Sequence, residues 1–406
     1  MAFTNMTMMF TSMSHAIITV TSDRVSDDVT QDMNNATAAI AVMKATSTPE
    51  SENEMIAIIR KEDYTEYKIG QILLTYVLFG IMVFGLVGNT TSIVVLRCSS
   101  MFLNPSSVYL IALAISDTFA LILGGGRVWL IRAWGINIRA THEWVCKLHH
   151  FSIYTLLDFS AWLLVALSVD RVITVYMPLR AKLVCTRIRA VIVSLCILIT
   201  LMLINGHYLF TVGYFIKIDN GRVRFEGNCY FVDGTKTFHT KYWFWIDAFV
   251  ASLVPFSLLT ISNVMIIIQL IRASQRRRQT MQAVSSSSSD NQTRSLTIML
   301  ICLSITFLIL TGPVVVHFIV DKSLNGPAGP HERAKTHLNS AIVFCLMYTN
   351  NAINFILYCV SGKKFRSSLV DVFCGSRRRR NLLKDYRASL ATSRSALSTS
   401  DVSQTT

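Results

Sequence analysis

The amino-acid sequence predicts an all-α membrane protein, a seven-transmembrane helix bundle with a short C-terminal membrane-surface helix. Of the 406 residues, 52% are hydrophobic and only 15% are charged, whereas about 25% of the residues of an average soluble domain are charged. The charges lie between seven long apolar segments, so lipid is the natural solvent for most of the chain. These segments are continuously apolar rather than alternating, which favours helices over the strands of a membrane barrel.

Each segment is long enough to cross a membrane, which takes about 20 mainly apolar residues in a helix. Four of the underlying apolar runs contain no charged residue, and the other three contain one acid each, namely Asp117, Asp158 and Asp247. The predicted spans are residues 69–96, 104–131, 146–176, 188–216, 242–271, 295–320 and 336–361. The bundle is therefore expected to occupy residues 69–362.

The polar ends of the chain predict its orientation. Residues 1–68 carry ten acidic against five basic side chains and the N-glycosylation acceptors Asn5 and Asn35, as expected of a disordered extracellular tail. Basic residues accumulate in the connections on the opposite side, which the positive-inside rule places in the cytoplasm. Residues 363–374 are expected to form the membrane-surface helix and residues 375–406 a disordered cytoplasmic tail. We therefore expect a multi-pass protein in the lipid of the plasma membrane.

The composition also bears on other classes of protein. A formal charge of +14 would suit a nucleic-acid binder if it covered a folded polar face, but it is spread over short connections, so no nucleic acid is expected. Nothing in the sequence indicates an enzyme. A transporter or channel is an alternative, because Asp117 and Asp158 could belong to an ion path. That class predicts repeated halves and broken spans, which the sequence does not show.

Five short motifs stand in order along the expected spans, in the first, second and seventh spans and at both ends of the third. They are Gly88-Asn89, the segment from Leu113 to Asp117, Cys146, the pair Asp170-Arg171 followed by Pro178-Leu179, and the segment from Asn354 to Tyr358. Over about three quarters of its length, from Gly70 to Cys374, the chain resembles the rhodopsin-like (class A) G-protein-coupled receptors. Its closing segment, residues 350–366, is most similar to invertebrate neuropeptide receptors of the FMRFamide and myosuppressin-like kind.

The resemblance implies several sites within the bundle. Cys146 and Cys229 are the only cysteines assigned to the oxidising exterior, so a disulfide between them is expected, with two free thiols as the alternative. Palmitoylation is expected at Cys374. Asp117 matches the family position that binds an allosteric sodium ion, with Ser160, Asn350 and Asn354 as its companions. The alternative there is a protonated Asp117 in a hydrogen-bonded polar cluster. No other cofactor is expected.

The resemblance also assigns an activation switch and a surface for a G protein. Arg171, paired with Asp170, is expected to restrain the third span. The other switch residues carried over are Phe307, Pro313, Asn354 and Tyr358, and the G-protein contacts are Arg171 and Leu179. Several family residues are absent, because the tryptophan between Phe307 and Pro313 is missing and Asn263 and Phe355 replace a tyrosine and a proline. These departures keep a silent, decoy-type receptor open as an alternative.

The sequence says less about the class of ligand than about the fold. Ile153 stands where receptors for biogenic amines have an aspartate, so an amine is not expected. A mouth that would suit a short amidated peptide is predicted from Arg127, Trp129, His150, Tyr154, Asp247, Phe318, Asp321 and Phe344. Asp247 and Asp321 could receive a cation, and Arg127 a carboxylate or a backbone carbonyl. For Asp247 the alternative is an internal hydrogen bond.

The expected function is thus that of a G-protein-coupled receptor for a short neuropeptide. Its expected partners are the peptide and a heterotrimeric G protein. The serine run from Ser285 to Ser289 and the Ser/Thr-rich segment after Ser389 would be open to receptor kinases and arrestin. A chemosensory receptor for small molecules is the alternative within the same fold.

Overall fold

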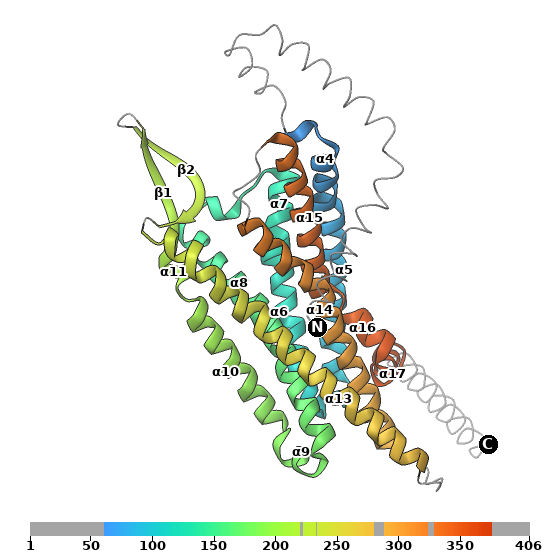
Figure 1. The fold of residues 1–406 in the computed structure, drawn as a ribbon. Helices are drawn as coiled ribbons and strands as arrows, with labels where there is room; N and C mark the ends of the chain where they lie inside the picture. Colours follow the sequence, from blue (N-terminus) through green and yellow to red (C-terminus); the bar gives the residue numbers. More distant parts are fainter. Residues whose placement is uncertain (1–60, 220–221, 233, 280–287, 324–328, 376–406) are drawn as a thin grey trace, which may run out of the picture. The chain divides into compact units, whose positions relative to one another are not determined.

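The computed structural model describes residues 61–219, 222–232, 234–279, 288–323 and 329–375 (Figure 1). The chain divides into two units, one of residues 73–315 and 344–406 and the other of residues 1–72 and 316–343. Each unit is considered by itself. Asn5 and Asn35, the serine run except its last two residues, and the C-terminal Ser/Thr-rich segment lie outside the described residues.

Within the described residues, six helical segments are long and apolar enough to cross a membrane, and a bent pair of helices supplies a seventh. The first three segments are α4 (Thr65–Ile72) with α5 (Leu78–Cys98), α6 (Pro105–Ala120) with α7 (Gly126–Trp134), and α8 (Glu143–Tyr176). The next three are α10 (Arg187–Asn205) with α11 (Tyr208–Thr211), α12 (Phe244–Ala248) with α13 (Val254–Gln279), and α14 (Ser288–Ser323). The seventh is α15 (Pro330–Ala352) with α16 (Asn354–Ser361), bent by 51°. The predicted helical membrane bundle is confirmed.

Short elements connect these helices. Turns of 3-10 helix cover Lys61–Asp63, Ser100–Leu103 and Ile138–Ala140, and π-helical turns cover Leu73–Val77, Leu121–Gly125, Phe238–Trp243, Phe249–Leu253 and Asp371–Gly375. Helix α9 (Pro178–Val184) follows α8, and α17 (Lys363–Val370) follows α16. Three of these π-helical turns, Leu73–Val77, Leu121–Gly125 and Phe249–Leu253, lie between the paired helices of the first, second and fifth spans, so each of these spans continues across a wider turn.

Local side chains explain where several helices begin. Asn104 caps α6 by accepting a hydrogen bond from the amide of Ser106 at 3.2 Å, and Pro105 occupies the first helical position. His142 accepts a bond from the amide of Trp144 at 3.2 Å at the start of α8. Such caps satisfy amide groups that have no partner inside the helix.

Helix α8 lies at the centre of the larger unit. It packs against α6, α10 and α13, and these helices lie side by side in Figure 1. The buried core includes Leu110, Leu163, Leu167, Phe307 and Tyr358. Large apolar side chains also point outward, among them Val87 at 63% and Leu203 at 77% exposed, as expected of a surface that contacts lipid.

The largest departure from the prediction is a β-hairpin. The fourth span was expected to reach residue 216, but its helices end at Thr211 and strand β1 (Val212–Asp219) follows. Strand β1 pairs antiparallel with β2 (Arg222–Phe231), with an irregularity between Tyr214 and Phe215. Apolar length alone does not distinguish this segment from a helix, whereas its aromatic and β-branched residues favour a strand.

Other predicted boundaries also differ. The first span was expected at residue 69, but helix α4 begins at Thr65, inside the predicted tail. Helices α13 and α14 extend into the predicted third connection, and α15 begins at Pro330 rather than at residue 336. The number of consecutive apolar residues predicts only the part of a helix that lies in the hydrocarbon core of the membrane. A helix can continue beyond that core, because its polar residues are then in contact with water, and so the observed helices are longer than the predicted spans.

Candidate functional site

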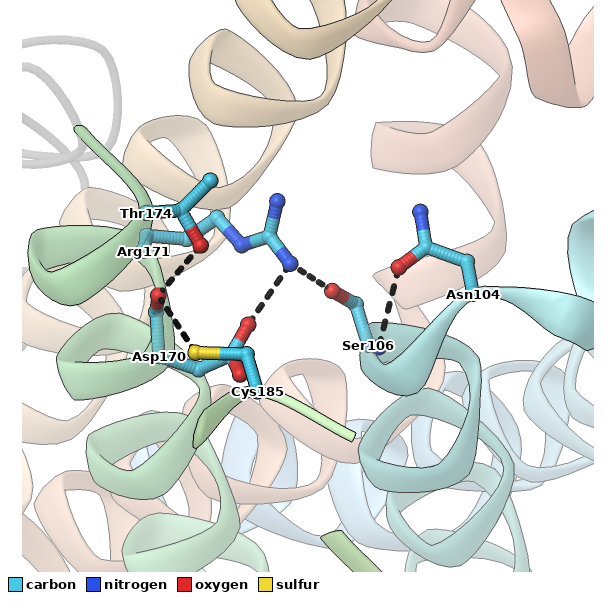
Figure 2. A network of polar contacts seen from close by, with 6 residues as sticks. All are labelled: Asn104, Ser106, Asp170, Arg171, Thr174 and Cys185. Carbon is cyan, nitrogen blue, oxygen red and sulfur yellow. Dashed lines mark hydrogen bonds and ion pairs between the residues drawn. The ribbon is translucent and has the colours of Figure 1, made fainter. Parts of the chain in front are cut away.

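The first candidate site lies at the end of α8 that carries Asp170 and Arg171. The Arg171 Nη2 atom donates to Asp170 Oδ2 at 2.6 Å, and both side chains are only 6% exposed. The same Nη2 atom donates to the hydroxyl of Ser106, in the first turn of α6 (Figure 2). The predicted pair is therefore formed, and it joins α8 to α6 through a serine that the sequence analysis did not single out.

The backbone carbonyl of Asp170 organises the neighbouring segment. It accepts hydrogen bonds from Thr174 Oγ1 at 2.7 Å and from Cys185 Sγ at 3.8 Å (Figure 2). Burial, followed by the negative charge of Asp170, raises the pKa of the Cys185 thiol to about 11. The thiol therefore keeps its proton at neutral pH and acts as a donor, which holds the residue after α9 close to α8.

The two predicted G-protein contacts differ in accessibility. Leu179 lies in α9 with 82% of its surface exposed, and Leu183, one turn later, is 73% exposed. Arg171 is 5% exposed. The segment after α8 was treated as a loop in the sequence analysis, whereas the structure has a helix there that displays two leucines.

Asp117 lies in a buried polar cluster between α6, α8 and the bend of the seventh span. Its Oδ1 accepts from Ser160 Oγ at 2.8 Å and from Asn351 Nδ2 at 2.7 Å, and its Oδ2 accepts from Asn354 Nδ2 at 2.6 Å. The prediction of Asn350 at this position was wrong. Asn351 in α15 and Asn354 in α16 both reach Asp117 at the bend, whereas Asn350 is rotated by about 100° from Asn351 about the axis of α15.

The same cluster tests the predicted sodium site. A hard cation takes oxygen ligands, but both amides present nitrogen donors to Asp117. Ser160, Asn351 and Asn354 all donate to the carboxyl group, so the hydrogen-bonded polar cluster of the alternative is present, whereas the protonation of Asp117 is not tested by these bonds.

The remaining switch residues lie along the same bundle. Phe307 is buried with its ring edge against Phe256, the centroids 5.4 Å apart. Pro313 lies inside α14. Tyr358 is buried, its ring centroid 5.4 Å from that of Phe365 in α17, and its hydroxyl has no hydrogen-bond partner among the described residues. The side chain of Cys374, the predicted palmitoylation site, lies outside the described residues.

A second candidate site lies at the other end of α8. A disulfide joins Cys146 in α8 to Cys229 in β2, with the Cα atoms 5.7 Å apart, as predicted. It fixes the hairpin to the start of α8. Cys146 also belongs to a small buried cluster with Tyr208, Val212 and Trp243, so the hairpin, α11 and the start of the fifth span share one apolar contact.

Four of the residues predicted to bind ligand surround this end of α8. Tyr154 stacks on Tyr208 with ring centroids 4.7 Å apart, and its ring lies 6.4 Å from that of His150. Tyr154 is within electrostatic range of Asp247. Arg127, in α7, is in turn within range of Tyr154. The predicted mouth is thus partly assembled around Tyr154.

The other four predicted ligand contacts are Trp129, Phe344, Phe318 and Asp321, and the structure describes contacts for Trp129 alone among them. The Trp129 indole donates to the carbonyl of Thr75 at 3.0 Å and stacks on Phe79, so it packs α7 against the first span. Phe344 is half-buried in α15. Phe318 and Asp321 belong to the other unit, and the structure does not describe their side chains.

Sequence reasoning missed an acidic partner beside Asp247. Asp158 is 2% exposed and accepts a hydrogen bond from Asn205 Nδ2 at 2.9 Å. One turn further along α8, the Trp162 indole donates to the carbonyl of Val250 at 3.0 Å, which places the Asp158 face of α8 against the fifth span. Asp158 and Asp247 are within electrostatic range of each other. A lone acid in each of two spans was a usable signal, since such residues require a partner or a function.

Comparison with known proteins agrees with this geometry. The profile of the family described as "7 transmembrane receptor (rhodopsin family)" matches residues 88–358. The chain belongs to this family. The receptor therefore shares the helical bundle of that family, and the motifs that carried the resemblance lie inside the matched region.

Individual relatives are distant. The receptor is 25% identical over 338 residues to "Rhodopsin, GQ-coupled" of Mizuhopecten yessoensis, covering 78% of this chain and 63% of the relative. It is 26% identical over 292 residues to "Growth hormone secretagogue receptor type 1" of Sus scrofa, covering 70% and 76%. It is 25% identical over 297 residues to "Galanin receptor 2b" of Danio rerio, covering 72% of each chain. The match thus spans less than two thirds of the length of the first of these relatives.

Proposed function

We propose that the receptor binds a short peptide at the end of α8 that carries Cys146 and passes the signal to a heterotrimeric G protein at the end that carries Arg171. In this proposal the N-terminus is extracellular and the C-terminus cytoplasmic. The observation that carries it is the buried pair of Asp170 and Arg171, which ties α8 to Ser106 in α6. A buried charge pair of this kind is stable only while its geometry is maintained, which suits a switch.

Activation follows from the chemistry of this pair. When bound ligand moves α8 relative to α6, Arg171 loses Ser106, and its guanidinium becomes available to the G protein. Leu179 in α9, the helix that follows α8, already presents an exposed apolar side chain. Kinases and arrestin would then act on the Ser/Thr-rich segments, and a lipid attached to Cys374 would hold α17 on the membrane.

The choice of a peptide as ligand has separate support. Two of the relatives are named as receptors for galanin and for growth hormone secretagogues. The predicted mouth combines aromatic rings with charged groups of both signs, which suits a peptide better than a small apolar molecule. Ile153, at the position that carries an aspartate in amine receptors, is buried and apolar.

The test is nucleotide exchange on purified heterotrimeric G proteins by the receptor in lipid nanodiscs, challenged with a panel of short amidated peptides. Wild type should accelerate exchange with at least one peptide. Arg171→Ala should abolish that acceleration, and Arg132→Ala, which changes an exposed arginine of α7, should leave it intact. Peptide binding without exchange in wild type would support the decoy-type alternative instead.

A further inference from the structure

Arg139 is held in an unusual way near the start of α8. It lies in the turn Ile138–Ala140 between the second and third spans. Its Nε atom donates to His149 Nδ1 at 2.9 Å, and its Nη1 atom contacts His150 Nε2 at 2.8 Å. Two consecutive histidines of α8 thus fix the orientation of one guanidinium.

Both histidines are neutral acceptors in this arrangement. The second ring nitrogen of His149 donates to the carbonyl of Leu123 at 2.9 Å, and that of His150 donates to the carbonyl of Cys146 at 3.0 Å. Each ring therefore has its proton on the nitrogen that faces a carbonyl and a lone pair on the nitrogen that faces Arg139. Arg139 is oriented by two uncharged groups, and no carboxylate among the described side chains forms an ion pair with it.

A second guanidinium lies near Arg139. Arg127 is half-buried in α7, and its Nε atom is buried without a hydrogen-bond partner among the described residues. Burial, followed by the positive charge of Arg127, lowers the pKa of Arg139 from 12.5 to about 10. Arg139 therefore still carries its charge at neutral pH, and the two cations are close enough to repel each other.

No carboxylate of the described residues forms an ion pair with either arginine. The hydroxyl-bearing residues Tyr154 and Tyr348 are the groups within electrostatic range of both. Removing cations from water without a counter-charge is costly, so such groups are normally paired. Arg139 has three N–H groups beyond those that face the histidines, and the planar guanidinium fits the two oxygens of a carboxylate.

We propose that Arg127 and Arg139 form an anion-binding subsite and that the ligand presents a carboxylate to it. This inference rests on the proposed function, because it names a property of the ligand for the same pocket. The proposal also restricts which peptides could be the ligand. A peptide amidated at its C-terminus must carry the carboxylate on a side chain, and any other peptide can use its free C-terminus.

The test is affinity selection followed by mass spectrometry, with the full-length receptor in nanodiscs and no G protein present. The probe is an equimolar pool of synthetic hexapeptides and small organic acids. Each compound is paired with its uncharged amide, either Glu against Gln or C-terminal acid against C-terminal amide. Wild type should retain at least one acid about tenfold more than its amide, as expected for charge-assisted hydrogen bonds. Arg127→Gln and Arg139→Gln should remove this preference, and Arg132→Gln should retain it.

Melting temperature without ligand distinguishes this role from a structural one. Arg127 has no hydrogen-bond partner for its Nε atom among the described residues, so if its charge also lacks a counter-charge, Arg127→Gln should not melt below wild type. Arg127→Lys and Arg139→Lys keep the charge and should retain part of the preference for acids.

The inference is overturned if wild type prefers no acid to its amide, whether both bind or neither does. It is also overturned if the glutamine variants keep the preference or if Arg127→Gln melts lower than wild type. Acid binding without G-protein activation would refute the proposed function but would still support the anion-binding subsite. Preference for small acids over all peptides would refute only the peptide as ligand.

Discussion

One atom of Arg171 connects two helices, since the Nη2 nitrogen that pairs with Asp170 also donates to the hydroxyl of Ser106. The charge pair by itself lies within α8 and could move with that helix. Only the bond to Ser106 ties it to α6. Restraint of α8 therefore depends on a neutral serine as much as on the charged residues.

Ser106→Ala is therefore expected to raise basal G-protein activation. Loss of one hydrogen bond to a charged group corresponds to about 1.5–3 kcal/mol, or more than tenfold in the equilibrium between resting and active states. The measurement is nucleotide exchange without ligand at matched receptor amounts. Ser107→Ala is the matched control, because Ser107 is also buried but donates to the carbonyl of Met101. Equal basal rates for both variants would contradict the role of Ser106.

Asp170→Asn should also raise basal exchange, because the guanidinium of Arg171 loses its charged partner. The effect should exceed that of Ser106→Ala, since a buried cation without a counter-charge is destabilised by about 3–5 kcal/mol. The comparison is made with nucleotide exchange by both single variants and by the double variant. A double variant that merely adds the two single effects would show that the two bonds act independently.

Leu179→Ala should reduce ligand-stimulated exchange without reducing the amount of receptor at the cell surface. Leu179 is 82% exposed, so its loss creates no cavity, and burial of its side chain against a G protein is worth about 2 kcal/mol. Leu195→Ala removes a leucine that is 52% exposed in α10 and serves as the control. The prediction fails if the two variants couple equally well.

Replacing Cys146 or Cys229 by serine should lower both surface expression and melting temperature. A disulfide that closes a loop of this length stabilises by about 4 kcal/mol in the chain-entropy description, and this one holds the hairpin on α8. Peptide mapping under non-reducing conditions should recover the two cysteines in one linked fragment. Replacing Cys196, which is free and exposed in α10, should change neither quantity.

Asp247→Asn should weaken a basic peptide far more than its uncharged analogue. The Asp247 carboxylate faces Asp158 within electrostatic range and makes no hydrogen bond to a described residue, so a ligand cation would relieve the repulsion between the two acids. Binding is measured for both peptides on wild type and variant. Equal losses would support the internal structural role instead.

Chain spacing was enough to predict the groups that lie within one helix. Asp170 and Arg171 are adjacent, and their pairing followed from the sequence. Ser106 and Asn351 were missed because contacts between helices depend on rotation about each helix axis. The break at Ile353, between α15 and α16, sets that rotation for the asparagines, and no pattern of apolar residues reports it.

The ligand pocket was the least predictable part for the same reason. The spacing of residues along the sequence does not reveal that the Trp129 side chain packs against the first span. It also does not reveal that Arg139, between the second and third spans, is hydrogen-bonded to two histidines of α8. The disulfide was the exception, since compartment and residue type leave few choices. Apolar length placed the spans but assigned Val212 and the residues after it to a helix, because strand and helix share that composition.

The π-helical turn Leu121–Gly125 sets the angular position of Arg127. Each residue of an α-helix advances by about 100°, so the extra residue of a wider turn rotates all that follows it. Gly124 lies against Tyr348 and Ile153, where any larger side chain would collide. Inserting one alanine between Gly125 and Gly126 as an extra residue of regular helix would rotate Arg127 by about 100°, put Gly126 in its place and leave every charge in the chain. The receptor would then lose the carboxylate preference through rotation alone, which makes the register of α7 a determinant of ligand choice.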